Sequence, residues 1–282
     1  MKKRFFGVFL ALMLVLAGTV GIAAPAMRIQ KVYAAENKTR YKEEGGTYLG
    51  LFTETINYSY KEESFFIHKP GLPGYSSSLG CGIIAGTNIV SWYNRTYSGL
   101  IPGHTAGQYF WGNWMWATSN SYIAGVNSQL SSDMNAVNKG VTISGYLGGL
   151  NTYVTNKGRT FESVNMMGTG GLGNVLDQDY KEAIEDDGKL MTIFLDGFNI
   201  MSLGGVKSYE SQGYDTVAME EYTGAHIMVA YGFYEISYFS APNTMFRQDI
   251  YLIVHTGFGG LLGMTRITAN CTLDDAYITH IY

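Results

Sequence analysis

The sequence predicts an α+β fold, with a helical N-terminal half followed by an antiparallel β C-terminal half. Three observations predict it. Apolar residues recur at spacings of three and four in the first half, while short apolar runs separated by glycine and asparagine fill the second half. The composition, 46% hydrophobic and only 15% charged, is that of a chain that buries a core rather than staying disordered. The length of 282 residues fits one large domain or two small ones.

Helical patterns dominate the middle of the first half. The clearest spans residues 81–95, where Ala85, Ile89, Trp92 and Thr96 fall on one face. Three others follow, near residues 126–137, near 147–154 with a stop at Asn156-Lys157-Gly158, and at 177–187 with acidic residues in the first turn. The strand-like runs come next, at residues 190–195, 227–231, 249–254, 264–268 and 276–281.

The first 35 residues have the pattern of a secretory signal peptide. Lys2, Lys3 and Arg4 precede an apolar stretch over residues 5–22, and small residues allow cleavage after Ala34 or Ala35. An uncleaved membrane anchor is the alternative, because the apolar stretch is nearly long enough to span a bilayer. Cleavage predicts a secreted, extracellular or cell-envelope-associated protein without a stable membrane span. Residues 36–64 would then form an N-terminal arm and residues 65–282 the main domain.

Charge and cysteine content exclude several functions. The chain has 19 basic and 23 acidic residues, a balance that argues against a nucleic-acid-binding protein. Two cysteines are too few for a disulfide-stapled scaffold or a zinc cage, and no HExxH or paired Cys/His spacing occurs. We therefore expect no metal and no cofactor. The sequence does not indicate an oligomeric state.

Cys81 lies between two glycines where a loop meets a predicted helix. The positive end of a helix stabilises a thiolate, so a cysteine there is a candidate nucleophile, and the adjacent N–H groups are candidate oxyanion donors. Two other interpretations are open: a disulfide with Cys271, which an oxidising compartment would permit, and simple core packing. A cysteine nucleophile needs a base, and among five histidines His226 begins one apolar run and His255 ends another.

Three sequence blocks resemble the papain-like cysteine peptidases, and look closest to a secreted bacterial branch related to double-glycine-leader peptidases. The blocks are GCGIIAGTNI at residues 80–89, with WYNR and LIP after it, GAHIMVAYGF at 224–233 and YLIVHTGFGG at 251–260. His226 follows Cys81 by 145 residues, within the spacing of 130–150 that papain-like enzymes show. The resemblance covers roughly residues 65–282. It implies a papain-like fold and a peptide or protein substrate.

The resemblance also implies roles for individual residues. Cys81 would be the nucleophile and His226 the base that takes its proton and later protonates the leaving amine. The position that usually orients the imidazole is Thr256, with His255 beside it as another possible orienter. The position of the usual oxyanion glutamine is Tyr75, followed by Ser76, Ser77 and Ser78, whose hydroxyls are possible oxyanion donors. The chain is thus expected to be a secreted cysteine peptidase, or alternatively an inactive papain-like binding protein.

An aromatic run at residues 109–116 (YFWGNWMW) permits two interpretations. It would either pack in the core or between domains, or form a wall of a substrate cleft.

Overall fold

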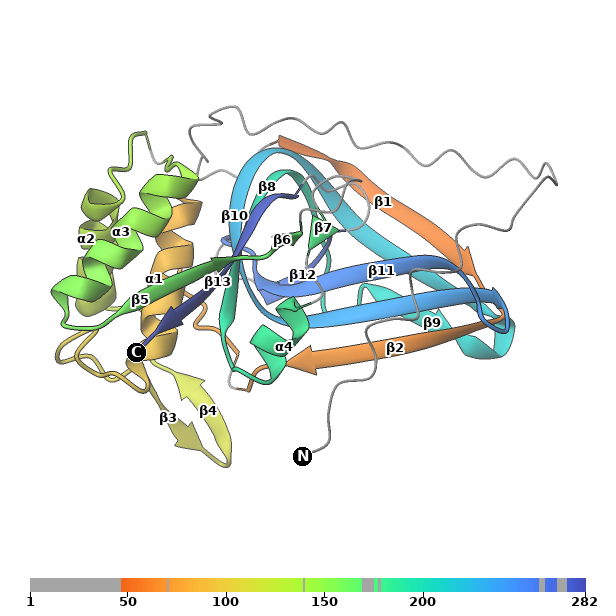
Figure 1. The fold of residues 1–282 in the computed structure, drawn as a ribbon, viewed down its shortest axis with the longest axis horizontal. Helices are drawn as coiled ribbons and strands as arrows, with labels where there is room; N and C mark the ends of the chain where they lie inside the picture. Colours follow the sequence, from red (N-terminus) through yellow and green to blue (C-terminus); the bar gives the residue numbers. More distant parts are fainter. Residues whose placement is uncertain are drawn as a thin grey trace. The chain divides into compact units, whose positions relative to one another are not determined.

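A computed structural model describes residues 47–69, 71–138, 140–168, 175–176, 179–258, 262–267 and 273–282 (Figure 1). The predicted signal peptide, residues 36–46 of the predicted arm, and Cys271 lie outside the described residues. All described residues belong to one structural unit. It is α+β, with a mostly antiparallel sheet and few helices, as the sequence predicts.

Four helices match the four helical patterns, with shifted ends: α1 Cys81–Asn94, α2 Ser121–Asp133, α3 Ile143–Asn156 and α4 Tyr180–Glu185. Helices α2 and α3 begin four or five residues before the apolar patterns, where Asn120 and Thr142 cap them. The Asn120 side chain accepts hydrogen bonds from the N–H groups of Tyr122 and Ile123, and Thr142 accepts one from Gly145. No described helix has the length and apolar character needed to cross a bilayer.

Helix α1 is surrounded by protein, because 13 of its 14 residues are buried. Its glycines permit this packing. A Cβ at Gly82 would lie 2.5 Å from a methyl group of Val141, and one at Gly86 would lie 2.8 Å from Met134. Figure 1 shows α1, α2 and α3 together beside the large sheet. Their apolar side chains form one core with one face of that sheet.

Nine strands form the main sheet: β1 Thr47–Asn57, β2 Tyr60–Ile67, β5 Phe161–Asn165, β8 Leu190–Ile200, β9 Val206–Tyr209, β10 Tyr214–Ala241, β11 Thr244–His255, β12 Leu262–Arg266 and β13 Leu273–Ile281. A short 3₁₀ turn, Glu210–Gln212, joins β9 to β10. Two separate two-stranded sheets consist of β3 Gly107–Phe110 with β4 Asn113–Trp116, and β6 Met167–Gly168 with β7 Val175–Leu176.

Strand β10 organises the sheet, because its 28 residues serve several partners in succession. Along one edge it pairs with β1 up to Thr223 and with β11 from Val229 onward. Along the other edge it pairs with β9, β8 and β2. In the described chain, residues 225–228 therefore have a strand partner on one edge only, which is β8. The opening created on the other edge contains His226.

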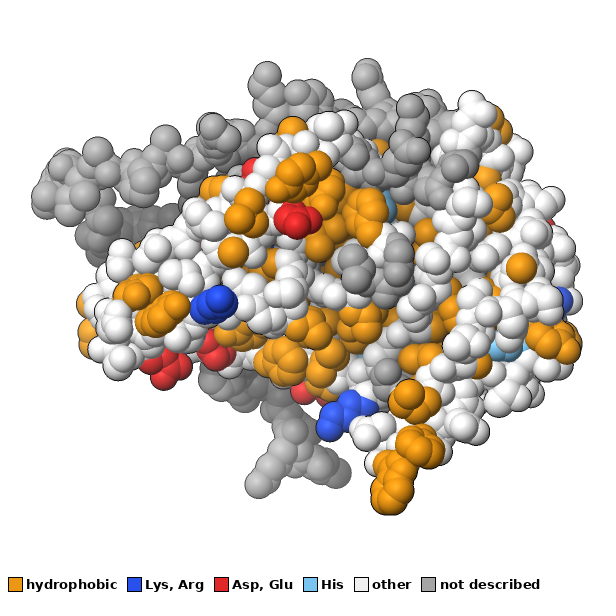
Figure 2. Space-filling model, turned by 180° about the vertical axis from the view of Figure 1, so that it is seen from behind, with side chains coloured by type: hydrophobic (Ala, Val, Ile, Leu, Met, Phe, Trp, Pro, Cys, Tyr) orange, Lys and Arg blue, Asp and Glu red, His pale blue; other side chains and the backbone are white. Residues whose placement is uncertain are grey.

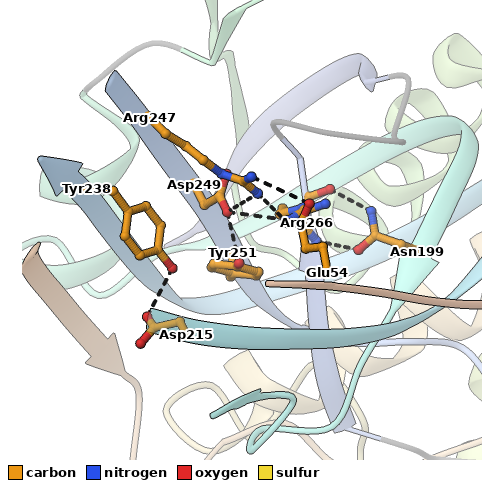
Figure 3. Close-up of polar contacts among 8 residues, drawn as sticks. All are labelled: Glu54, Asn199, Asp215, Tyr238, Arg247, Asp249, Tyr251 and Arg266. Carbon is orange, nitrogen blue, oxygen red and sulfur yellow. Dashed lines mark hydrogen bonds and ion pairs between the residues drawn. The ribbon is translucent and has the colours of Figure 1, made fainter. Parts of the chain in front are cut away.

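The end of β8 meets β12 and closes a small barrel of β8, β10, β11 and β12. Met201 and Met264 exchange two backbone hydrogen bonds, both 2.9 Å long. The side-chain amide of Asn199 continues this pairing by donating to the Arg266 carbonyl and accepting from the Arg266 N–H, each at 2.7 Å (Figure 3). A second core collects apolar side chains of β8, β10, β11 and β13 together with Tyr180 and Ile184 of α4.

The prediction of an arm at residues 36–64 is wrong for its described part, because residues 47–64 lie in β1 and β2 and pair with β10. The N-terminal half is accordingly not purely helical. The sequence pattern missed β1 because most of its side chains stay exposed and only Ile56 is fully buried. A strand that pairs through its backbone while burying little leaves a weak periodic signal.

Candidate active site

Cys81 is the first residue of α1, and its side chain is completely buried. The preceding Gly80 has φ 122°, a backbone conformation that side chains disfavour, so glycine allows the loop to turn directly into the helix. No side chain caps this helix, and no acidic residue lies in its first turn. The helix start is thus electrostatically favourable for a thiolate or an oxyanion.

His226 lies on β10 where the strand lacks its second neighbour, and its imidazole is held by one hydrogen bond. The Nε2 atom lies 2.6 Å from the main-chain oxygen of Thr256, which can only accept, so Nε2 carries the proton. The opposite nitrogen, Nδ1, therefore has a lone pair. It is buried and has no hydrogen-bond partner among the described residues. This nitrogen is the one that can accept a proton.

Gly257 packs between the His226 imidazole and Cys81. A Cβ built on Gly257 would lie 3.3 Å from both Cε1 and Nε2 of His226, and 3.9 Å from the Cβ of Cys81. Gly257 also has φ 79°, which favours glycine. Independently, a Cβ on Gly82 would lie 3.2 Å from Ile227, so the start of α1 packs on β10 beside His226. The structure thus brings Cys81 and His226 together from positions 145 residues apart.

Aromatic rings enclose the His226 imidazole. Phe198 of β8 and Phe258 stack on it with centroid distances of 4.8 and 4.9 Å. This burial lowers the pKa of His226 to about 4, although the hydrogen bond to Thr256 opposes the shift. At neutral pH the imidazole is therefore uncharged and keeps its Nδ1 lone pair.

The other predicted residues lie in different places. Thr256 contacts His226 through its main-chain oxygen, whereas its hydroxyl accepts from the N–H of Phe258. His255 is buried and its Nδ1 accepts from the N–H of Gly257, so it supports the loop that carries Thr256. Ser76 and Ser78 are exposed, and Ser77 accepts from the N–H of Leu79. Within the described chain no hydrogen bond links these three serines to Cys81 or His226.

Tyr75, at the expected oxyanion position, is a better candidate donor than the three serines that follow it. Its side chain is buried in the same core as Cys81, and its hydroxyl has no partner among the described residues. Burial raises its pKa to about 12, so the hydroxyl remains a donor at neutral pH. The sequence shows the residue type, but only burial distinguishes this hydroxyl from those of the neighbouring serines.

Other cavities and clusters in the described chain offer no comparable site. A cavity of about 360 Å³ is lined by residues of β5, α4 and β13 with Asp187 and Lys189, and none of its lining residues belongs to the Cys81–His226 site. Among the residues that the structure describes, no three His, Cys, Asp or Glu side chains are grouped to bind a metal. No family model, curated protein or solved structure matches the chain.

We expect stability to fall as the pH falls from about 6.5 to about 4. Burial also lowers the pKa of His255 to about 4, so in this window the unfolded chain binds protons that the folded chain rejects at both histidines. The loss at pH 5 should be a few kcal/mol for the two together. Urea unfolding at neutral pH and near pH 5 measures it, and His226→Gln should reduce the difference. An unchanged difference in this variant would contradict the assignment.

Proposed function

We propose that this protein is a papain-like cysteine peptidase that hydrolyses peptide bonds through an acyl-enzyme on Cys81. One observation carries the proposal. Gly257 lies between the start of α1 and the imidazole, and a Cβ built on it would lie 3.9 Å from the Cβ of Cys81 and 3.3 Å from Cε1 and Nε2 of His226. The order of the blocks along the chain and the placement of the thiol on a helix and the imidazole on a barrel strand give further support.

The reaction follows from the protonation states. The His226 Nδ1 lone pair takes the proton of the Cys81 thiol as Sγ attacks the scissile carbonyl carbon. The tetrahedral oxyanion forms near the positive end of α1, where the Tyr75 hydroxyl is a candidate donor. Nδ1–H then protonates the leaving amine, and a thioester remains. Water, deprotonated by Nδ1, attacks that thioester, releases the carboxylic acid product and restores the thiol.

The Thr256 carbonyl has a defined part in this scheme. It holds the proton on Nε2, which fixes the tautomer and leaves Nδ1 as the base. It is also the nearest counterpart of the side-chain orienter in the family, and its partial charge stabilises the imidazolium less than a carboxylate would. The base is therefore weak in this fully buried state, with its pKa at about 4.

A second function has its own supporting observation. Cys81 and His226 are both 0% exposed, so a substrate carbonyl reaches Sγ only after surrounding side chains move. This burial favours an inactive papain-like fold that serves as a secreted binding protein. The two functions differ in one measurable property, which is whether the thiol reacts with a substrate-like electrophile.

Covalent labelling tests the proposal. The reduced protein is incubated with a peptidyl epoxide directed at cysteine peptidases, and the modified residue is located by mass spectrometry. We expect one adduct on Cys81, formed much more slowly in His226→Ala because the proton acceptor is missing.

The matched control is Cys271→Ser, which should be labelled at the wild-type rate. Intact mass after alkylation, with and without prior reduction, determines whether Cys81 and Cys271 are linked. A thiol at Cys81 that resists both the epoxide and iodoacetamide under reducing conditions would refute the peptidase and support the binding protein.

A further inference from the structure

The hairpin of β3 and β4 exposes a set of large apolar side chains. Trp111 at its tip is 88% exposed, and Tyr109, Phe110 and Met115 are each more than half exposed. The interpretation of this run as core packing is therefore wrong. Figure 2, which views the molecule from behind, shows apolar side chains on a protrusion at the lower right, where the hairpin lies. Contiguous exposed apolar surface of this kind marks an interaction site.

The hairpin packs against the end of α1 at its base, and its tip projects from the molecule. No other described strand pairs with β3 or β4, and an isolated two-stranded sheet is only marginally stable in water. The Arg95 guanidinium, just after α1, lies 4.2 Å from the ring centroid of Trp92 and within 6 Å of those of Trp114 and Trp116. At the turn, Trp111 has φ 51°, an unfavourable conformation for a bulky residue. The fold thus holds an aromatic side chain outward at an energetic cost.

Charge distinguishes this part of the chain from the rest. None of the 23 acidic residues lies between residues 64 and 132. This segment is nearly a quarter of the chain and includes the hairpin. Its charged residues are Lys69 and Arg95. An apolar tip with a cationic base and no nearby acid in sequence suits an anionic surface.

We propose that the β3–β4 hairpin inserts its tip into the interfacial region of a lipid bilayer that contains anionic headgroups. Tryptophan and tyrosine favour this region, and apolar side chains next to them enter the acyl boundary. A glycan would require hydrogen-bonding side chains for its hydroxyl groups, and on the hairpin only Gln108 and Asn113 carry amides. A protein groove would also accept apolar residues, but it would not require the absence of acid around them.

The insertion does not depend on the peptidase proposal. Arg95 follows the last residue of α1 and Cys81 is its first, so the hairpin base and the thiol lie at opposite ends of a helix about 20 Å long. Inserting the tip would leave the other end of α1 outside the bilayer.

Tryptophan fluorescence provides a direct test, because all four tryptophans, Trp92, Trp111, Trp114 and Trp116, lie in the hairpin or at its base. The full chain is mixed with vesicles of phosphatidylcholine and phosphatidylglycerol whose acyl chains carry bromine as a quencher. We expect a blue shift and quenching of the emission. Residues 1–35 contain no tryptophan, so binding through that segment alone would not quench it.

Phe110→Ser keeps every tryptophan and should weaken the vesicle dependence of quenching about tenfold, because one large apolar side chain no longer leaves water. Phe65→Ser is the matched control, since Phe65 on β2 is 61% exposed but lies outside the hairpin, and it should quench like the wild type. Vesicles of phosphatidylcholine alone should quench less. Absence of quenching, equal quenching by both vesicles, or an equal effect of both variants would overturn the proposal, as would saturable binding of a glycan or protein without any quenching by vesicles.

Discussion

Cys81→Ala abolishes peptide hydrolysis, by a factor of at least about 10⁴, if Cys81 is the nucleophile, because no other group can form the thioester. The assay compares release of peptides from casein, followed by mass spectrometry, for wild type and variant under reducing conditions. Thermal unfolding of both proteins separates lost chemistry from lost folding, and removing one buried sulfur should leave the fold intact.

Cys271→Ala is the control for this measurement, because it removes the other cysteine and should preserve the rate. Cleavage at the same rate in Cys81→Ala and wild type would eliminate the acyl-enzyme. Loss of activity in both cysteine variants, with unfolding of both, would indicate a structural bridge instead.

Arg266→Met should destabilise the protein by about 3–5 kcal/mol, the largest stability effect that we expect. Arg266 is completely buried on β12 and forms ion pairs with Glu54 of β1 and Asp249 of β11 (Figure 3). Asp249 also accepts from Tyr251 at 3.1 Å and pairs with Arg247 at 2.7 Å. Removing the Arg266 charge leaves the buried Asp249 and the partly exposed Glu54 short of compensation, and urea unfolding measures the loss.

Arg247→Met is the comparison, because Arg247 also pairs with Glu54 and Asp249 but its side chain is 26% exposed. Water can partly replace this guanidinium, so a smaller loss is expected. The pKa of Glu54 should rise toward its ordinary value in either variant, since burial raises it and the two arginines more than offset that effect. Equal stability of Arg266→Met and wild type would show that the network contributes nothing to barrel closure.

Sequence patterns predicted the elements that bury an apolar face. The α1 prediction at residues 81–95 differs from the observed helix by one residue, and every apolar run of the second half lies at least partly in a strand. The patterns missed the strands whose side chains are mostly exposed. Strand β1 is held by backbone pairing with β10, and the β3–β4 hairpin by its own pairing and by Arg95 against Trp114 and Trp116. Neither leaves a periodic apolar pattern in the sequence.

The sequence by itself determined the α+β class and the helix start at Cys81, and it predicted His226 as the partner of this cysteine, because residue type and spacing record which groups can be buried and which can react. The tertiary structure decided the rest. It gave the imidazole contact to the Thr256 carbonyl rather than to the hydroxyl, left Tyr75 rather than the serines with a buried hydroxyl, and exposed Trp111. Main-chain contacts, burial and exposure arise only when distant segments pack together, so no local pattern encodes them.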